Sequence, residues 1–172
     1  MKRALFFILL IAAVLAPQQF YGQETTSDQT TVYYCIRHAE KDRSDADNKN
    51  PNLTETGKQR AAKWAKVFEH VAFDAIYSTD YNRTQQTALP TSLMQELEIQ
   101  SYDPRNLYSA DFAAATQGKT VLVVGHSNTT PMFVNAVLEK ETYPWIADDN
   151  NGMLFIVTKS GEKVTIQVLQ ID

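Results

Sequence analysis

Four basic side chains stand where an apolar run of the sequence ends or where the following helix is expected to begin. Arg37 and His38 close one apolar run, His126 directly follows a second, and Arg83 comes soon after a third. The planar guanidinium of arginine suits phosphate oxygens, and a neutral imidazole is a competent nucleophile near pH 7. These residue types therefore suit phosphoryl transfer, which mainly requires positioning and charge neutralisation.

The three apolar runs, at residues 31–37, 73–78 and 120–125, are rich in the residue types of buried strands. The run at 120–125 has no polar alternation, which is typical of a central strand covered on both faces. Ligands of open α/β sheets bind beyond the carboxyl ends of the strands. We therefore expect the four basic side chains to meet in one crevice, although 88 residues separate His38 from His126.

The segments between and after these strands predict the rest of the fold. Helical spacing of apolar residues follows Thr54, a plausible N-cap. Further elements are expected in this order: a helix at 84–98 containing Pro90, a strand at 99–102, a short helix at 110–116, a helix from Pro131, and strands at 153–158 and 164–169. The last two strands predict a hairpin. The expected fold is an α/β three-layer sandwich, with a mostly parallel central sheet, helices on both faces and a C-terminal hairpin.

Four motifs carry a resemblance to a known family. They are RHAEK at 37–41, LTETG at 53–57, the segment from Ser78 to RTQQTA at 83–88, and VGHS at 124–127. Their order and spacing, over residues 31–170, resemble the histidine phosphatase superfamily, also called the phosphoglycerate mutase-like family, in its compact phosphatase branch.

The resemblance implies a metal-independent phosphatase without a cofactor. Such an enzyme would hydrolyse phosphate monoesters, or a phosphorylated protein side chain, through a phosphohistidine on His38. Arg37, Arg83 and His126 would hold the phosphate oxygens, and we add Ser127, the neighbour of His126, to this predicted phosphate site. The acid-phosphatase branch of the family has Asp at the position of Ser127, so the proton donor must be sought elsewhere.

A poor leaving group such as an alkoxide needs a general acid near the bridging oxygen. The family commonly supplies a carboxylate between the second arginine and the second histidine, a region that here contains Glu96, Glu98, Asp103 and Asp111. Asp103 directly follows the strand expected at 99–102, which would place it at the catalytic edge. We predict that Asp103 is the general acid, with Asp111, or no residue at all, as the alternative.

Three other functions stay open at this point. A phosphomutase of the same fold would need groups that keep water from its intermediate, and no lid is obvious in the sequence. A phosphate-binding module without catalysis would not need intact His38 and His126. A metallohydrolase is disfavoured because the chain has three histidines without His-x-x-x-His spacing, so no metal site is predicted.

The N-terminus resembles a secretory signal peptide, because Lys2 and Arg3 precede a 13-residue apolar run at 4–16. That run is shorter than the roughly 20 residues of a membrane-spanning helix. We expect residues 1–22 to be removed, residues 23–30 to form a flexible leader, and the catalytic domain to span 31–172. The protein would then be periplasmic or secreted, without membrane association after processing.

The charge of the mature chain bears on its partners. Without Lys2 and Arg3 it has 14 basic and 20 acidic residues, a net charge of −6. An acidic protein lacks the basic surface that binds nucleic acid. No nucleic-acid partner is therefore expected, the partner being a phosphorylated substrate.

Overall fold

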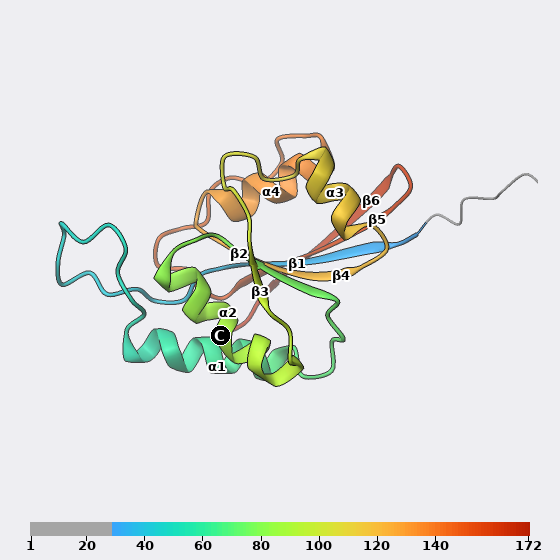
Figure 1. The fold of residues 1–172 in the computed structure, drawn as a ribbon. Helices are drawn as coiled ribbons and strands as arrows, with labels where there is room; N and C mark the ends of the chain where they lie inside the picture. The colour runs from blue at the N-terminus through green and yellow to red at the C-terminus, as the bar shows by residue number, and fades with distance from the viewer. Residues whose placement is uncertain (1–28) are drawn as a thin grey trace, which may run out of the picture.

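The computed structural model describes residues 29–172, so the predicted signal peptide and most of the predicted leader lie outside the described residues. The elements in chain order are β1 (Thr31–Arg37), α1 (Glu55–Val67), β2 (Ala75–Ser78), α2 (Asn82–Gln95), β3 (Ile99–Ser101), α3 (Ala110–Thr116), β4 (Thr120–Gly125), α4 (Thr129–Leu138), β5 (Met153–Ser160) and β6 (Lys163–Gln170). Helices α3 and α4 cover one face of the sheet, and α1 and α2 cover the other (Figure 1). The predicted three-layer α/β sandwich is confirmed.

Within the described residues, six strands form one sheet in the order β3-β2-β4-β1-β5-β6. Strands β1 to β4 are mutually parallel, whereas β5 pairs antiparallel with β1 and β6 pairs antiparallel with β5. The last two strands form the predicted hairpin, whose turn contains Gly161 with a φ of 56°. The carboxyl ends of the four parallel strands lie at the same end of the sheet. This is the arrangement that would bring the four basic residues together.

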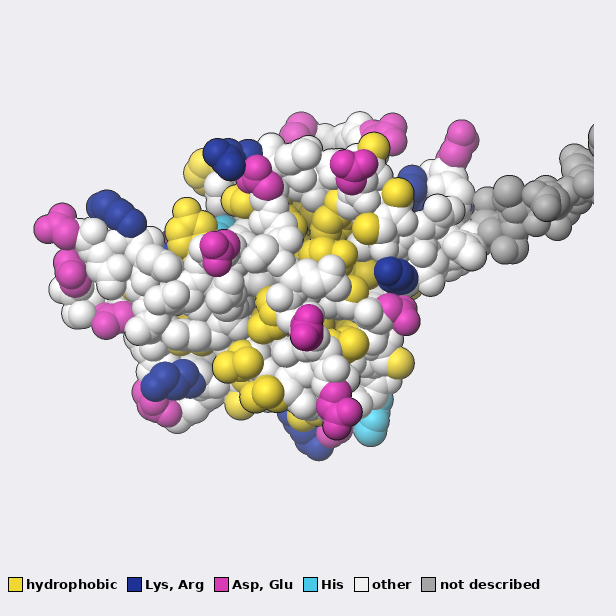
Figure 2. Space-filling view, viewed as in Figure 1, with side chains coloured by type: hydrophobic (Ala, Val, Ile, Leu, Met, Phe, Trp, Pro, Cys, Tyr) yellow, Lys and Arg dark blue, Asp and Glu magenta, His cyan; other side chains and the backbone are white. Residues whose placement is uncertain are grey.

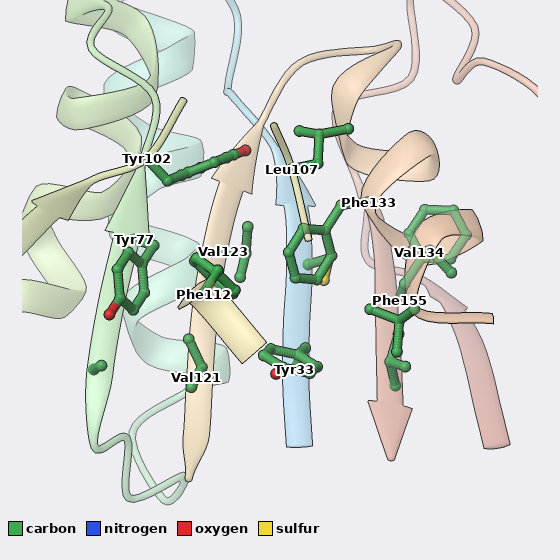
Figure 3. Close-up of a cluster of buried hydrophobic side chains, with 14 of the residues drawn as sticks. Tyr33, Tyr77, Tyr102, Leu107, Phe112, Val121, Val123, Phe133, Val134 and Phe155 are labelled. Atoms are coloured by element: carbon green, nitrogen blue, oxygen red, sulfur yellow. The ribbon is translucent and has the colours of Figure 1, made fainter. Parts of the chain in front are cut away.

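Strand β4 lies at the centre of the hydrophobic core because it is buried on both faces. Val121 and Val123 pack in the cluster under α3 and α4, together with Phe112 and Phe133 (Figure 3). Leu122 and Val124 belong to the opposite cluster, which includes Trp64 and Phe68 of the α1 region. This double burial explains why the strand has no polar alternation. Cys35 of β1 is fully buried in the first cluster, and burial raises the pKa of its thiol.

Helix α2 differs from its predicted range of 84–98. It begins two residues earlier and ends at Gln95, where Glu96 adopts a left-handed conformation with a φ of 54°. The backbone N–H of Leu97 then donates to the carbonyl of Ser92 at 3.1 Å, which closes the helix. Pro90 lies inside the helix without ending it, because packing against α1 and the sheet outweighs the local preference.

The exterior of the described domain is mixed in charge. Figure 2 shows Lys and Arg side chains interspersed with Asp and Glu over the face that looks onto the β3 edge. None of the described helices is long and apolar enough to cross a membrane.

Candidate active site

The register of the parallel strands places His38 beside His126. Arg37 of β1 lies opposite Gly125 of β4, so each histidine is the first residue beyond a paired strand end. The backbone N–H of His38 extends this pairing by donating to the carbonyl of Gly125 at 2.9 Å. The two imidazole centroids are 5.4 Å apart at an interplanar angle of 68°. The predicted juxtaposition of the two histidines is thus present.

Gly125 has no room for a side chain at this strand end. A Cβ there would lie 2.9 Å from the hydroxyl oxygens of Thr129 and Thr130 and 3.0 Å from that of Tyr102. These hydroxyls belong to the start of α4 and to the segment after β3. The glycine in the VGHS motif therefore lets both segments close against the end of β4.

His38 is held as a neutral imidazole with one free nitrogen. Its ring is 4% exposed, and its Nδ1 lies 2.7 Å from the carbonyl oxygen of Ala39. A carbonyl can only accept, so Nδ1 carries the proton and Nε2 keeps its lone pair. Burial, and then the charges of His126, Arg37 and Arg83, lower the pKa of His38 to about 3, although the bond to Ala39 opposes this. Nε2 is therefore available as a nucleophile at neutral pH.

His126 is fixed from two sides. Its Nε2 lies 2.9 Å from the hydroxyl of Thr79, and the ring of Tyr81 meets its ring edge-on at 5.1 Å between centroids. The hydroxyl of Thr79 also lies 3.0 Å from that of Thr84, the first buried residue of α2. Burial, followed by the charges of Arg83, Lys41 and Arg37, lowers the pKa of His126 to about 4.

Arg37 is buried and oriented by the loop between α4 and β5. Its Nη1 donates to the carbonyl oxygens of Ala147, Asp148 and Asn150 at 2.8, 3.0 and 3.1 Å. Its Nη2 donates to the Asp148 carboxylate at 2.8 Å. Its Nε, which is buried, has no partner among the described residues. The edge formed by Nε and the second Nη2 hydrogen is the part of this guanidinium left for a ligand.

Arg83 presents a second unsatisfied edge. Its guanidinium carbon lies 4.4 Å from the ring centroid of Tyr81, and Nη1 makes only a long bond of 3.5 Å to the carbonyl of Lys49. Its buried Nε likewise has no partner within the described part of the chain. A buried donor left unsatisfied costs roughly 1–3 kcal/mol. Arg37 and Arg83 therefore each keep an Nε donor available to an oxyanion.

The LTETG motif supports the loop that follows His38. Thr54 donates its backbone N–H to the carbonyl of Glu40 at 2.9 Å, and its hydroxyl accepts from the N–H of Gly57 at 3.0 Å as the predicted N-cap. A Cβ on Gly57 would lie 2.2 Å from the Glu40 carbonyl oxygen. Helix α1 can therefore approach this loop only with glycine at position 57.

Thr87 of α2 ties the same loop to Arg83. Its hydroxyl accepts from the backbone N–H of Ala39 at 2.9 Å and donates to the carbonyl of Arg83 at 2.6 Å. A single side chain thus links the segment after the nucleophile to the helix that bears the second arginine. This contact explains the second threonine of the RTQQTA motif, Thr87, without a direct role toward substrate.

A comparison with protein families points to the same residues. The model of the histidine phosphatase superfamily (branch 1) matches residues 33–104, which contain His38 and both arginines. Over these residues the chain is similar to the histidine phosphatase superfamily. No curated protein matches the sequence closely enough to count as a relative.

Solved structures share the fold of the chain. A protein histidine phosphatase, SixA, in complex with tungstate superposes with a TM-score of 0.66 at 19% identity, over 81% of this chain and 96% of that one. Phosphoglycerate mutase from Bacillus anthracis gives 0.64 at 14%, over 84% and 94%. A phosphoserine phosphatase variant from Entamoeba histolytica, in complex with phosphoserine, gives 0.61 at 15%, over 80% and 95%.

Two of the predicted site residues have other contacts. The carbonyl of Ser127 accepts from the N–H of Ile146 at 2.8 Å, in the turn before α4. Asp103 is 47% exposed and accepts from Arg105 Nε at 3.0 Å and from Nη2 at 3.2 Å. These hydrogen bonds lower the pKa of Asp103, which keeps the carboxyl ionised at neutral pH. The roles of Ser127 and Asp103 stay predictions.

The loop between α4 and β5 contacts both Arg37 and His38. Besides holding Arg37, it bonds His38 through Asn151, whose Nδ2 donates to the His38 carbonyl at 2.8 Å. Most of its acceptors are backbone carbonyls, which no residue type reveals in a sequence. The loop closes a cavity of about 240 Å³ beside the nucleophile, lined by Arg37, His38, Glu40, Lys41, Arg43, Asp148, Asp149 and Asn151.

In residues 29–172, no group of three or more His, Cys, Asp or Glu side chains is arranged to hold a metal ion. His70, the remaining histidine of the chain, follows α1 with a side chain that is 92% exposed. It lies 3.4 Å from the Glu69 carboxylate and belongs to no site.

Proposed function

We propose that the protein is a metal-independent phosphatase that hydrolyses phosphate monoesters, or a phosphorylated protein side chain, through a phosphohistidine on His38. The observation that carries the proposal is the free Nε2 of His38 beside two guanidinium groups whose buried Nε donors lack partners. A phosphoryl group is the ligand that satisfies both donors while presenting phosphorus to the nucleophile. Two of the solved structures that share the fold, a protein histidine phosphatase and a phosphoserine phosphatase, support this substrate class.

In the first half-reaction, Arg37 and Arg83 bind the non-bridging oxygens of the phosphate, and His126 adds a third polar contact. Nε2 of His38 attacks phosphorus as the bond to the bridging oxygen breaks, and the alcohol leaves with a proton. In the second half-reaction, water attacks the phosphohistidine, releasing inorganic phosphate and restoring the imidazole. The two guanidinium groups stabilise the charge that the transition state spreads over the equatorial oxygens.

The experiment is trapping of the phosphoenzyme. Protein mixed with ³²P-labelled substrate and quenched in alkali should retain label on His38, and acid should release it. His38→Ala should lose the label and turnover, whereas His70→Ala, a histidine outside the site, should keep both. Activity should also survive a chelator. Full turnover by His38→Ala would contradict the proposed nucleophile.

A phosphomutase is the second candidate, because phosphoglycerate mutase shares the fold. A mutase passes the phosphoryl group from His38 back to a second hydroxyl instead of to water. Product analysis in ¹⁸O-labelled water separates the two functions. We expect ¹⁸O in free inorganic phosphate, whereas a mutase would return unlabelled phosphate to the substrate.

A further inference from the structure

The two arginines of the candidate site are held in different ways. The guanidinium of Arg37 donates to three backbone carbonyls and to the Asp148 carboxylate. Within residues 29–172, Arg83 forms no ion pair, and its guanidinium makes only the long bond of 3.5 Å to the Lys49 carbonyl. Apart from this bond, the guanidinium rests on the ring of Tyr81. The position of Arg83 therefore depends mainly on the backbone that carries it.

That backbone is the first turn of α2, and its cap comes from a distant part of the chain. Tyr81 occupies the N-cap position but makes no side-chain capping bond. Instead, the N–H of Asn82, the first residue of α2, donates to the side-chain Oδ1 of Asn50 at 2.8 Å. Asparagine suits this role because its side-chain oxygen accepts from the free N–H groups at a helix start. The cap thus joins Asn50 to the residue next to Arg83.

Side-chain amides reinforce the contact between Asn50 and α2. Asn50 Nδ2 donates to Asn82 Oδ1 at 3.3 Å, and Asn82 Nδ2 donates to the Asn50 carbonyl at 3.3 Å. The Oδ1 of Asn52 accepts from Asn82 Nδ2 and from Gln86 Nε2 at 2.9 Å each. Gln86 Oε1 in turn accepts from the N–H of Leu53 at 2.8 Å. Because Asn82 and Gln86 are four residues apart, one face of α2 is bound to residues 50–53.

Asn50 belongs to a long loop, residues 42–52, whose base is fixed next to the nucleophile. Figure 1 shows this loop extending away from the body of the domain. At its base, Lys41 and Leu53 form an antiparallel bridge, and the N–H of Asp42 donates to the carbonyl of Asn52 at 2.8 Å. One loop therefore connects the segment that follows His38 to the first turn of α2.

We propose that Asn50 is a positioning residue for the phosphate site, because it caps α2 and so fixes Arg83 where its guanidinium meets a phosphate bound at His38. Asn50 acts through the N–H of Asn82 and does not itself touch the substrate. Without the cap, the first turn of α2 can fray, and Arg83 then spends less time in contact with the anion. This inference rests on the proposed function, in which Arg83 binds phosphate oxygens.

The test measures the binding of tungstate, an oxyanion that cannot be turned over, by isothermal titration calorimetry. We expect Asn50→Ala to raise the Kd of tungstate about 5-fold, the factor that corresponds to a lost helix cap. The kcat/KM for 4-nitrophenyl phosphate should fall by a similar factor. Ser44→Ala is the matched control and should change neither value. It alters another exposed residue of the same loop, whose N–H bonds Asp42 and not α2.

A double-mutant cycle separates positioning of Arg83 from a merely structural role of Asn50. In an Arg83→Ala background, Asn50→Ala should change the Kd of tungstate less than about 2-fold, because the contact it supports is gone. An equal loss in both backgrounds, or an unchanged Kd in Asn50→Ala alone, would overturn the role of Asn50 while wild-type protein still labels His38. Wild-type protein that neither binds tungstate nor labels His38 would overturn the proposed function, and the role of Asn50 with it.

Discussion

His38 and His126 are two imidazoles that the fold keeps uncharged beside arginines. Their pKa values are lowered to about 3 and about 4, first by burial and then by neighbouring cations. In the unfolded chain a histidine titrates near 6.5. At pH values between the pKa of the unfolded chain and the lower pKa values of the folded protein, the unfolded state binds protons that the folded state does not bind. The stability from keeping these rings neutral is therefore full above about pH 6.5 and is lost as the pH falls toward the folded pKa values.

This linkage predicts a pH-dependent stability in the ligand-free protein. The free energy of unfolding should fall as the pH is lowered from 7 to 4. Removing one such group, as in His38→Gln, should reduce the slope by about 1 kcal/mol per pH unit between pH 6 and 4.5. Urea titrations at several pH values measure it, and His70→Gln, which changes an exposed ring, serves as control. An unchanged slope in His38→Gln would show that the native ring titrates like the unfolded one.

At the scale of elements, α1 and α2 act as supports for the loop that follows the nucleophile. Thr54 caps α1 and binds the Glu40 carbonyl, while Thr87 of α2 binds the Ala39 N–H. The loop between α4 and β5 supports Arg37 in the same way from the other side. The positions of His38 and Arg37 in the candidate site thus depend on contacts with α1, α2 and the loop between α4 and β5.

Gly57→Ala tests the support given by α1. Glycine to alanine in a helix ordinarily stabilises by about 0.5–1 kcal/mol, but here the added Cβ would lie 2.2 Å from the Glu40 carbonyl oxygen. We expect a loss of about 1–3 kcal/mol of stability, by the usual cost of overpacking, together with a lower kcat/KM because the loop after His38 must shift. Unfolding in urea and steady-state kinetics measure both, with exposed Thr56→Ala as control. A more stable, fully active Gly57→Ala variant would mean that the loop after His38 can move without loss of stability or activity.

The sequence predicted the structure best where burial restricts the residue types that a position can hold. The unbroken apolar run of β4, the hairpin of β5 and β6, and the meeting of His38 with His126 at adjacent strand ends all follow from periodicity and topology. Two features escaped prediction for physical reasons. Arg37 is oriented by backbone carbonyls more than 100 residues away, which any residue can provide. Asp103 lies close to the end of β3 as expected, but its pairing with Arg105 depends on side-chain rotamers.

At the scale of the whole molecule, the N-terminal segment is expected to be removed by cleavage. The packed domain starts at Thr31, which is 5% exposed and whose hydroxyl accepts from the Gly118 N–H at 2.9 Å. We propose that the chain is exported and cleaved near Gly22, because Lys2, Arg3 and the apolar run have the pattern of a signal peptide.

Intact-mass measurement of protein from its native host tests export. We expect a soluble chain that begins near Gln23, outside the cytoplasm. A purified chain starting at Gln23 should match, in melting temperature and kcat/KM, one starting at Ser27, since both retain the packed domain from Thr31 onward. A difference between these two chains would show that the leader contributes to the fold. A cytoplasmic protein that still begins at Met1 would overturn the export proposal while leaving the chemistry at His38 untouched.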